Sequence, residues 1–166
     1  MGKLTGKVAI ITGASKGIGR GIALAFARAG ADLLLSSRGQ ESLESTAQEV
    51  AELGVRVEIQ AGDVGSETDV QAMFDHWESS FEQLDLMVNN AGAFNGGPLD
   101  ELATEDWDHV INTNLRGPFL CTRAAMQIMK RQGGGRIINI GSISAQRVRF
   151  NSAPYSTSKH GLWGLT

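Results

Sequence analysis

Short apolar segments alternate with amphipathic segments along the whole chain. Continuous apolar runs such as residues 8–11 are typical of parallel strands that are buried on both faces. Strands are expected at 8–11, 33–38, 55–59, 84–88 and 136–140. Between them, apolar residues recur at helical spacing. This alternation, with no linker, predicts one α/β domain over residues 1–166, with a parallel sheet and right-handed crossovers.

Helices are predicted between these strands and again near the end of the chain. One follows the first strand and ends near Gly30, another spans 41–53, and a long one spans 105–131. Gly117 and Pro118 are expected to bend or interrupt the long helix, because proline breaks the backbone hydrogen-bond ladder. Trp107, Ile111, Phe119 and Ala124 are expected to form its inward stripe. The apolar positions at helical spacing on the other helices are Ile18, Ile22, Phe26, Ala29, Leu43, Ala47, Val50, Val70, Phe74, Trp77 and Phe81.

The composition of the chain argues against several classes of function. The 166 residues are 42% hydrophobic, enough for one sizeable core, and the net charge of -3 does not suit a nucleic-acid partner. No apolar run is long enough to cross a membrane. The single cysteine, Cys121, fits a reducing cytoplasm and is expected to be a small buried hydrophobe. Because the three histidines share no ligand spacing with it, no metal site is expected.

A glycine-rich turn, residues 12–19, joins the first strand to the first helix. Glycines permit a tight turn and let a phosphate approach the backbone, and a helix N-terminus offers free N–H groups to that phosphate. The strand–turn–helix setting therefore favours dinucleotide binding over an ordinary glycine loop. The candidate residues in this turn are Gly13, Ser15, Lys16, Gly17, Ile18 and Gly19.

The end of the second strand bears on the choice of dinucleotide. NAD-binding domains usually carry an acid here, about 20 residues after the glycines, which holds the ribose 2′-hydroxyl. This strand ends in Ser37 and Arg38, whereas Asp32 stands at its other end and Glu41 opens the next helix. A guanidinium can bind a 2′-phosphate through two parallel hydrogen bonds. We therefore favour NADP over NAD, with Lys16 as a second cation; the alternative is that these basic residues are merely solvated.

Polar and small residues follow the third and fourth strands as well. Open α/β sheets bind ligands at the carboxyl ends of their strands. Asp63 and Val64 would therefore meet an adenine, unless Asp63 only caps a turn or a helix. The short residues Asn90, Ala91 and Gly92 would let the backbone pass close to a ligand.

Several later positions are candidates for a role in chemistry. Asn114 lies within the predicted long helix, where asparagine is unfavourable, so it is expected to have a partner or a task. Ser142 lies thirteen residues before Tyr155, and the loop between them is long enough to return the serine hydroxyl to the phenol. In that loop, Arg147 and Arg149 either are solvated or steer an acidic substrate or carrier.

Tyr155 and Lys159 are four residues apart in a helix predicted to begin near Pro154. Residues at this spacing share one helix face. An ammonium about 4 Å from a phenol stabilises the phenolate by roughly 4 kcal/mol at an effective dielectric constant of about 20. Such a pair can donate and accept a proton at neutral pH, as a carbonyl–alcohol interconversion requires. The alternative is an exposed polar helix face.

These segments together resemble the classical short-chain dehydrogenase/reductase superfamily, and notably its 3-oxoacyl-carrier-protein reductases. The resemblance rests on residues 12–19 and 89–92, on Asn114 and Ser142, and on the spacing from Tyr155 to Lys159. It implies a Rossmann sheet of order 3-2-1-4-5, normally continued by strands 6 and 7, with helices on both faces. It also implies an NAD(P)-dependent oxidoreductase and a small carbonyl or alcohol substrate that is possibly carrier-bound; a 3-oxoacyl thioester, a sugar, a steroid and a small ketone all remain open. For the full-length parent it implies a homodimer or homotetramer.

The resemblance further implies a role for each matching residue. Tyr155 would donate and accept the proton, and Lys159 would promote its ionisation and hold the nicotinamide ribose. Ser142 would hydrogen-bond the substrate oxygen, and Asn114 would hold a water that relays protons. The residues that would contact the cofactor are Gly13, Ser15, Lys16, Gly17, Ile18, Gly19, Ser37, Arg38, Asp63, Val64, Asn90, Ala91, Gly92, Tyr155 and Lys159.

Members of that family continue beyond the length of this chain, with two more strands and the loop that clamps nicotinamide and substrate. The chain is therefore expected to be the incomplete N-terminal part of a longer enzyme, with its fifth strand left as an uncovered sheet edge. A second interpretation is a truncated nucleotide-binding module with little or no turnover. A third is a structural or assembly role through the exposed edge and the long helix.

Overall fold

The structure is a computed structural model, and it describes residues 2–166. Five parallel strands form one sheet in the order β3-β2-β1-β4-β5, which confirms the expected order. The strands are β1 (Val8–Thr12), β2 (Asp32–Ser37), β3 (Val57–Ala61), β4 (Leu86–Asn89) and β5 (Arg136–Asn139). The strand order reverses between β1 and β4, and an open sheet binds its ligands at the carboxyl ends on either side of such a point.

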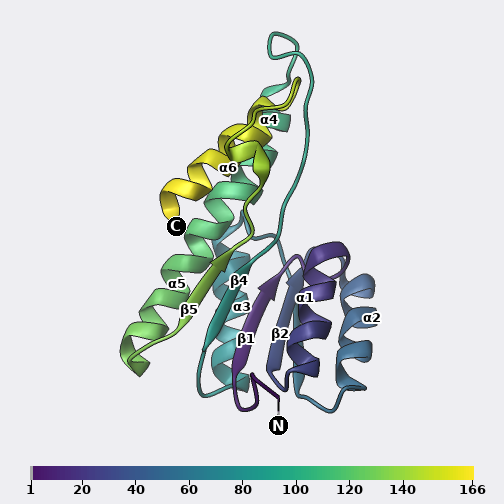
Figure 1. Cartoon of the computed structure of the whole chain (residues 1–166), viewed down its shortest axis with the longest axis vertical. Coiled ribbons are helices and arrows are strands. Elements are labelled where there is room, and N and C mark those ends of the chain that lie inside the picture. The colour runs from purple at the N-terminus through teal and green to yellow at the C-terminus, as the bar shows by residue number, and fades with distance from the viewer. Residues whose placement is uncertain (1) are drawn as a thin grey trace.

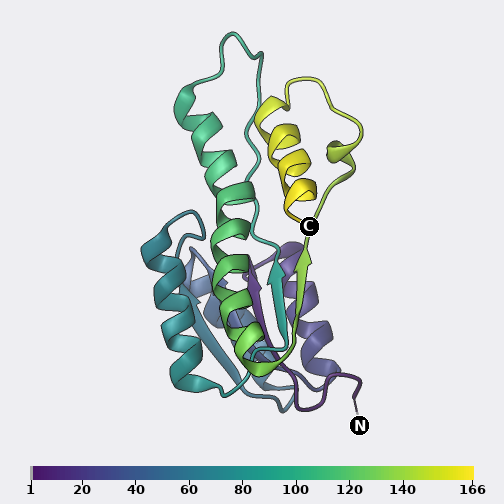
Figure 2. The same ribbon diagram turned by 90° about the vertical axis from the view of Figure 1, so that its left-hand side faces the viewer.

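Helices cover both faces of the sheet, as expected (Figure 1). One face carries α1 (Gly17–Arg28) and α2 (Gln40–Ala51), and the other carries α3 (Glu67–Ser80) and α5 (Gly117–Gln132). Two further helices, α4 (Thr104–Ile111) and α6 (Ala153–Leu165), stand beyond the carboxyl ends of the strands (Figure 2). Among residues 2–166, none of the helices is long and apolar enough to cross a membrane.

Successive residues of the central strands point to opposite faces of the sheet and build two separate cores. Ile10 and Met87 belong to the core under α3 and α5, whereas Ile11 and Leu35 belong to the core under α1 and α2. Cys121 is fully buried in the first of these cores, which confirms its expected placement. Burial raises the pKa of its thiol to about 12, so this cysteine is a packing residue and not a nucleophile.

Two strands lie two residues later than predicted. The sequence predicts strands at 55–59 and 84–88, whereas β3 and β4 begin at Val57 and Leu86. Near each start a side-chain carboxylate accepts a hydrogen bond from a backbone N–H. The Arg56 N–H donates to Asp32 Oδ1 at 2.8 Å, and Asp85 ahead of β4 accepts from the neighbouring strand. The other element ends differ from expectation by only one or two residues.

The long helix extends from Thr104 to Gln132, and it is interrupted as predicted, although the irregular turn lies just ahead of Gly117 and Pro118. The irregular segment is Asn112–Arg116, a π-helical turn labelled η1. Gly117 and Pro118 instead open α5, where the change from π to α pairing accommodates a residue without an N–H. Figure 2 shows α4, η1 and α5 as one rod that passes beyond the sheet.

Two positions predicted on apolar stripes are exposed. Phe119 is 44% exposed, whereas its neighbour Leu120 is buried. The π-helical turn inserts one residue between α4 and α5, so a stripe extrapolated from Ile111 fails by one position. Ile18, at the start of α1, is 66% exposed, and this helix buries Ala23 and its neighbours instead. Ile18 borders the groove described below.

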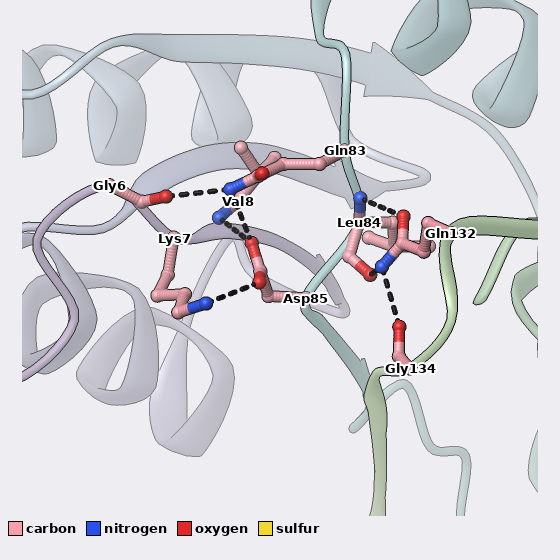
Figure 3. Close-up of polar contacts among 8 residues, drawn as sticks. All are labelled: Gly6, Lys7, Val8, Gln83, Leu84, Asp85, Gln132 and Gly134. Carbon is pink, nitrogen blue, oxygen red and sulfur yellow. Dashed lines mark hydrogen bonds and ion pairs between the residues drawn. The ribbon is translucent and has the colours of Figure 1, made fainter.

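Hydrogen bonds from side chains connect the amino ends of the strands, which lie at the opposite end of the sheet from the glycine turn (Figure 3). The Asp85 carboxylate accepts hydrogen bonds from the Val8 N–H at 2.9 Å and from Lys7 Nζ at 2.8 Å. Gln132, the last residue of α5, donates to the Leu84 carbonyl at 2.7 Å and accepts from the Leu84 N–H at 3.1 Å. These contacts hold β1, β4 and α5 in register at the end of the sheet that is distant from the candidate site.

Candidate functional site

A groove of about 560 Å³ lies at the carboxyl ends of the strands, over the glycine turn. Most of the predicted cofactor residues line it, although they come from four separate segments. Within residues 2–166, its lining does not include Gly17, Tyr155 or Lys159. The lining residues are Gly13, Ser15, Lys16, Ile18, Gly19, Ser37, Arg38, Gly39, Ser42, Gly62, Asp63, Val64, Asn90, Ala91, Gly92 and Thr113.

Two glycines of the turn are required by close packing. A Cβ at Gly13 would lie 2.8 Å from Ala91 Cα, and a Cβ at Gly19 would lie 2.2 Å from the Gly13 carbonyl oxygen. Gly13 also has a φ of 64°, a conformation that other residues rarely adopt. The floor of the groove is therefore bare backbone at the N-terminus of α1. Such a cradle fits a phosphate group, which binds to free N–H groups and to the positive end of the helix dipole.

A buried threonine joins the glycine turn to the loop that follows β4. The Thr12 hydroxyl accepts hydrogen bonds from the Asn90 and Ala91 N–H groups, each at 3.1 Å, and donates to the Val88 carbonyl at 3.3 Å. Asn90 Nδ2 in turn donates to the carbonyls of Thr12 at 2.9 Å and Gly13 at 3.2 Å. The side chain of Asn90 thus fixes one wall of the groove to the other.

Two cations line the groove, Lys16 just ahead of α1 and Arg38 just after β2. Lys16 and Arg38 are both exposed, and none of the ion pairs found among residues 2–166 involves either. Asp32 is the first residue of β2, and its carboxylate is engaged by the Arg56 N–H at 2.8 Å. The second strand therefore brings an arginine and not a carboxylate to the groove. This arrangement fits a phosphate better than a ribose hydroxyl pair.

Asp63 lines the groove and also makes the turn contact that the sequence left as an alternative. Its Oδ1 accepts from the Gly65 N–H at 2.8 Å, and its own N–H donates to the Asp69 carboxylate at 2.8 Å. Val64 packs against the start of α5. The contact is so close that a Cβ at Gly117 would lie only 2.7 Å from Val64 Cγ2. The π-helical turn therefore also sets the position of this part of the groove wall.

Asn114 is fully buried in η1, and its side chain makes three hydrogen bonds. Its Oδ1 accepts from the Ala93 N–H at 2.7 Å, and its Nδ2 donates to the Ala93 carbonyl at 2.9 Å and to Ser158 Oγ at 3.1 Å. Ser158 Oγ donates onward to the Tyr155 carbonyl at 2.7 Å. Asn114 thus connects the loop after β4 to α6, which satisfies the expectation that it has a partner.

Tyr155 and Lys159 share one face of α6, as their spacing predicts. Lys159 Nζ lies 5.8 Å from the centroid of the Tyr155 ring. The lysine is only 6% exposed, and its Nζ donates to the Ile140 carbonyl at 2.7 Å. Burial lowers the pKa of Lys159, because an ammonium loses its hydration there. The Tyr155 ring is half-buried and meets Phe94 edge-on, with the centroids 5.4 Å apart.

Ser142 lies between β5 and the short helix η2 (Ile143–Ala145). Its hydroxyl accepts from the Ser144 N–H at 3.1 Å. Helix α6 packs against both η1 and η2. The bond from Lys159 to Ile140 anchors α6 two residues ahead of Ser142. Of the candidate catalytic residues, Tyr155 and Lys159 thus lie on α6, Asn114 is bonded to α6 through Ser158, and Ser142 lies two residues after the carbonyl that holds Lys159.

Some residues at the site were not predicted from the sequence. Ser158 and Thr12 are connectors whose partners come from distant segments, so no local pattern marks them. Gly39 and Ser42 line the groove at the start of α2, and the position of that helix directly after Arg38 would have suggested them. Among residues 2–166, no group of three or more histidine, cysteine, aspartate or glutamate side chains could hold a metal ion.

The sequence matches a known family over almost its full length. The family model described as short chain dehydrogenase matches residues 7–166. A putative ketoacyl reductase of Streptomyces coelicolor is 38% identical over 162 residues, which are 96% of this chain and 62% of that protein. A sepiapterin reductase of Chlorobaculum tepidum is 39% identical over 165 residues, which are 95% of this chain and 68% of that protein. The chain thus spans roughly two thirds of the length of these relatives.

Solved structures of similar proteins share the fold. A short-chain type dehydrogenase/reductase from Mycobacterium marinum superposes with a TM-score of 0.94 at 35% identity, covering 98% of this chain and 67% of that one. A putative gluconate dehydrogenase from Agrobacterium tumefaciens gives a TM-score of 0.93 at 38% identity, with coverages of 98% and 64%. On the family match, the sheet order and these superpositions, the chain belongs to the short-chain dehydrogenase family.

Proposed function

We propose that this chain carries the NADP-binding and catalytic part of an oxidoreductase that interconverts a carbonyl and a secondary alcohol. The observation that carries the proposal is a buried lysine four residues after a half-buried tyrosine, on a helix anchored at the carboxyl ends of the sheet. This pair lies in a molecule that also has a bare phosphate cradle. Family relatives include a putative ketoacyl reductase and a sepiapterin reductase, which supports the reaction class.

The groove fits a dinucleotide phosphate. The pyrophosphate would lie on the bare backbone around Gly13 and Gly19, and a 2′-phosphate would lie between Arg38 and Lys16. Ser37 and the side chains of Asp63 and Val64 would border the adenosine half. When bound, the dinucleotide supplies or accepts the hydride. NADP suits these residues better than NAD, because the residue directly after β2 is the cation Arg38 and not a carboxylate.

The residues around α6 would handle the proton. Tyr155 gives its phenolic proton to the carbonyl oxygen during reduction and takes it back during oxidation. The Lys159 ammonium stabilises the phenolate that forms, and its hydrogen bond to Ile140 holds it in place. The Ser142 hydroxyl donates to the substrate oxygen, where negative charge develops. Asn114 would hold a relay water through its backbone, since its carboxamide is already bonded to Ala93 and Ser158.

The same family resemblance leads us to propose self-association. Side chains of α4, η1, α5 and α6 line an apolar hollow of about 460 Å³. It is lined by Ile111, Leu115, Arg116, Phe119, Gly161, Gly164 and Leu165. Phe119 is 44% exposed there, and Trp163 near the end of α6 is 59% exposed. A second copy of this chain would cover these side chains.

A titration with NADPH and with NADH, followed by nicotinamide fluorescence, tests the cofactor assignment. We expect NADPH to bind at least roughly tenfold more tightly than NADH, because charge-assisted hydrogen bonds to the 2′-phosphate contribute about 1.5–3 kcal/mol. Replacing Arg38→Gln should remove most of that preference, whereas Arg28→Gln, at the far end of α1, should not. Equal affinity for both dinucleotides would contradict the NADP assignment.

Turnover of a carbonyl panel with NADPH tests the reaction. We expect Tyr155→Phe to lower turnover by about 10²–10⁴-fold and to leave NADPH affinity nearly unchanged, because only the proton is lost. NADPH binding without turnover of any carbonyl compound would reject the oxidoreductase proposal. A nucleotide-binding module would then be the function that remains.

A further inference from the structure

The loop between η2 and α6 carries two arginines that the proposed mechanism does not use. Arg147 and Arg149 are exposed, and the ion pairs found among residues 2–166 include neither. The intervening Val148 is 67% exposed and the following Phe150 is 98% exposed. Unpaired guanidinium groups beside bare apolar side chains suit a ligand that has both an anionic and an apolar part.

Hydrogen bonds fix this loop next to the catalytic tyrosine. The Ser152 hydroxyl donates to the Arg149 carbonyl at 2.7 Å and lies 3.0 Å from the hydroxyl of Ser156, the residue after Tyr155. Asn151 has a φ of 54°, and its carbonyl accepts from the Gly97 N–H at 3.1 Å. The loop therefore bridges the segment after β4 and the start of α6. Figure 1 shows both loops together beyond the carboxyl ends of the strands.

The border of the catalytic residues is apolar. Phe94 is 66% exposed and lies edge-on against the Tyr155 ring. Ile143, directly after Ser142, is 68% exposed. The Asp106 carboxylate on α4 already has a partner, because its Oδ1 accepts a hydrogen bond from Asn95 Nδ2 at 2.6 Å. A substrate at the phenol would therefore lie beside apolar side chains, next to the loop that carries the two arginines.

We propose that Arg147 and Arg149 bind an anionic group of the substrate, which makes the substrate an acidic carbonyl compound with an apolar body. A guanidinium binds carboxylate and phosphate alike through paired hydrogen bonds. The anion is therefore either the carboxylate of a keto acid or a phosphate on the carrier of a thioester. This inference rests on the proposed function, because it assigns the substrate class of the same site.

Equilibrium binding tests the inference without requiring turnover. Calorimetry would compare three ligands: acetoacetyl-coenzyme A, which carries phosphates, acetoacetate, which carries a carboxylate, and the neutral S-acetoacetyl-N-acetylcysteamine. In the double variant Arg147→Gln/Arg149→Gln, we expect the affinity for an anionic ligand to fall roughly tenfold, since each exposed charge pair contributes up to about 1 kcal/mol. The affinity for the neutral thioester should be unchanged. The difference should shrink at high salt.

The matched control is Lys130→Gln/Arg131→Gln, which removes the same charge from the last turn of α5, at the other end of the molecule. It should leave all three affinities unchanged. A loss confined to acetoacetyl-coenzyme A identifies the phosphate as the anion, and a loss with acetoacetate identifies the carboxylate. Equal losses in both double variants, an unchanged affinity in the first, or no binding of either anion by the parent would overturn the inference.

Turnover with NADPH is measured in parallel and separates the two proposals. Anion binding that depends on Arg147 and Arg149, together with no reduction of any ligand, would reject the oxidoreductase function and retain the anion site. If both anionic ligands were reduced at a rate that the double substitution does not change, the oxidoreductase function would be retained and the anion site rejected.

Discussion

At the scale of single residues, Lys159 is held where a cation is unfavourable. Its side chain is 6% exposed, and the hydrogen bond found for its ammonium runs to the Ile140 carbonyl. Removing a cation from water costs free energy that one neutral acceptor offsets only in part. Burial accordingly lowers the pKa of this lysine. Lys159 therefore lowers the stability of the fold while it serves the proposed chemistry.

Replacing Lys159→Met should reveal this cost as a pH dependence. The folded-state pKa lies below the ordinary value of 10.5, so the unfolded chain binds the proton more tightly. The free energy of unfolding of the parent should therefore rise with pH from the folded-state pKa up to about 10.5. The methionine variant has no such titration. We expect it to be at least as stable as the parent at pH 7, with a margin that shrinks towards pH 10.5.

Urea denaturation at several pH values between 7 and 10 measures this margin. The control is Lys130→Met, at an exposed position on α5, which should show no comparable trend. If the difference in free energy of unfolding between the Lys159 variant and the parent stayed constant over this pH range, burial of the lysine would not lower the stability of the fold. Turnover should fall in the Lys159 variant, because the phenolate loses its counter-charge.

Residue roles were predictable from the sequence where backbone geometry demands one residue type. Gly13 and Gly19 are examples, since any side chain there would collide with neighbouring backbone. The pairing of Tyr155 with Lys159 followed from helix periodicity alone. The role of Ser158 did not, because its partner Asn114 lies 44 positions earlier and only the tertiary fold brings them together.

At the scale of elements, the end of α5 is fixed by one side chain. Gln132 makes both an acceptor and a donor contact with the backbone of the buried residue Leu84, just ahead of β4 (Figure 3). The clamp pairs the backbone N–H and carbonyl of Leu84, whereas the next residue, Asp85, bonds to the neighbouring strands through its own N–H and carbonyl.

Replacing Gln132→Ala should leave the Leu84 N–H and carbonyl without their partner. A buried polar group that loses its hydrogen bond costs about 1–3 kcal/mol. We expect the free energy of unfolding, measured by urea denaturation, to fall by that amount, with NADPH affinity nearly unchanged because the site lies at the opposite end of the sheet. Gln127→Ala, at an exposed position on the same helix, should cost less than about 0.5 kcal/mol. Equal losses in the two variants would exclude the clamp.

The types of the elements were predictable from periodicity, and their ends were not. Helices and strands alternate where expected because each buries one apolar face or run. Their ends depend on long-range partners such as the Asp32 carboxylate, which takes the Arg56 N–H. The π-helical turn also carries a long-range contact, since Asn114 within it is bound by the loop after β4.

At the scale of the whole molecule, the two ends of the sheet differ in structure. The amino ends of the strands are closed by the contacts of Asp85 and Gln132. The carboxyl ends are open, and the groove, helix α6 with its candidate catalytic residues and the loop with Arg147 and Arg149 all lie at this end of the sheet. The apolar hollow lined by α4, η1, α5 and α6 lies in this same half. Self-association through the hollow would thus bear on the helix that carries Tyr155.

Replacing Phe119→Asp tests the proposed self-association. A carboxylate buried in an apolar contact is strongly unfavourable, so the variant should dissociate at concentrations where the parent is a dimer or tetramer. We expect the dissociation constant to rise at least about tenfold by analytical ultracentrifugation. Leu53→Asp, at a 39% exposed position just after α2 on the other side of the sheet, should leave it unchanged. A parent that stays monomeric at high concentration would refute the proposal.

The π-helical turn has a consequence for how the gene can change. A segment such as Asn112–Arg116 holds more residues per turn than the α-helices on either side of it. An in-frame deletion of one codon here would remove the extra residue, so that α4 and α5 could fuse into one ordinary helix while Leu120 stays in the core. The deletion would instead remove the widened turn in which Asn114 is bonded to Ala93 and Ser158. A one-residue deletion in this stretch should therefore preserve the core and break the link between the loop after β4 and α6.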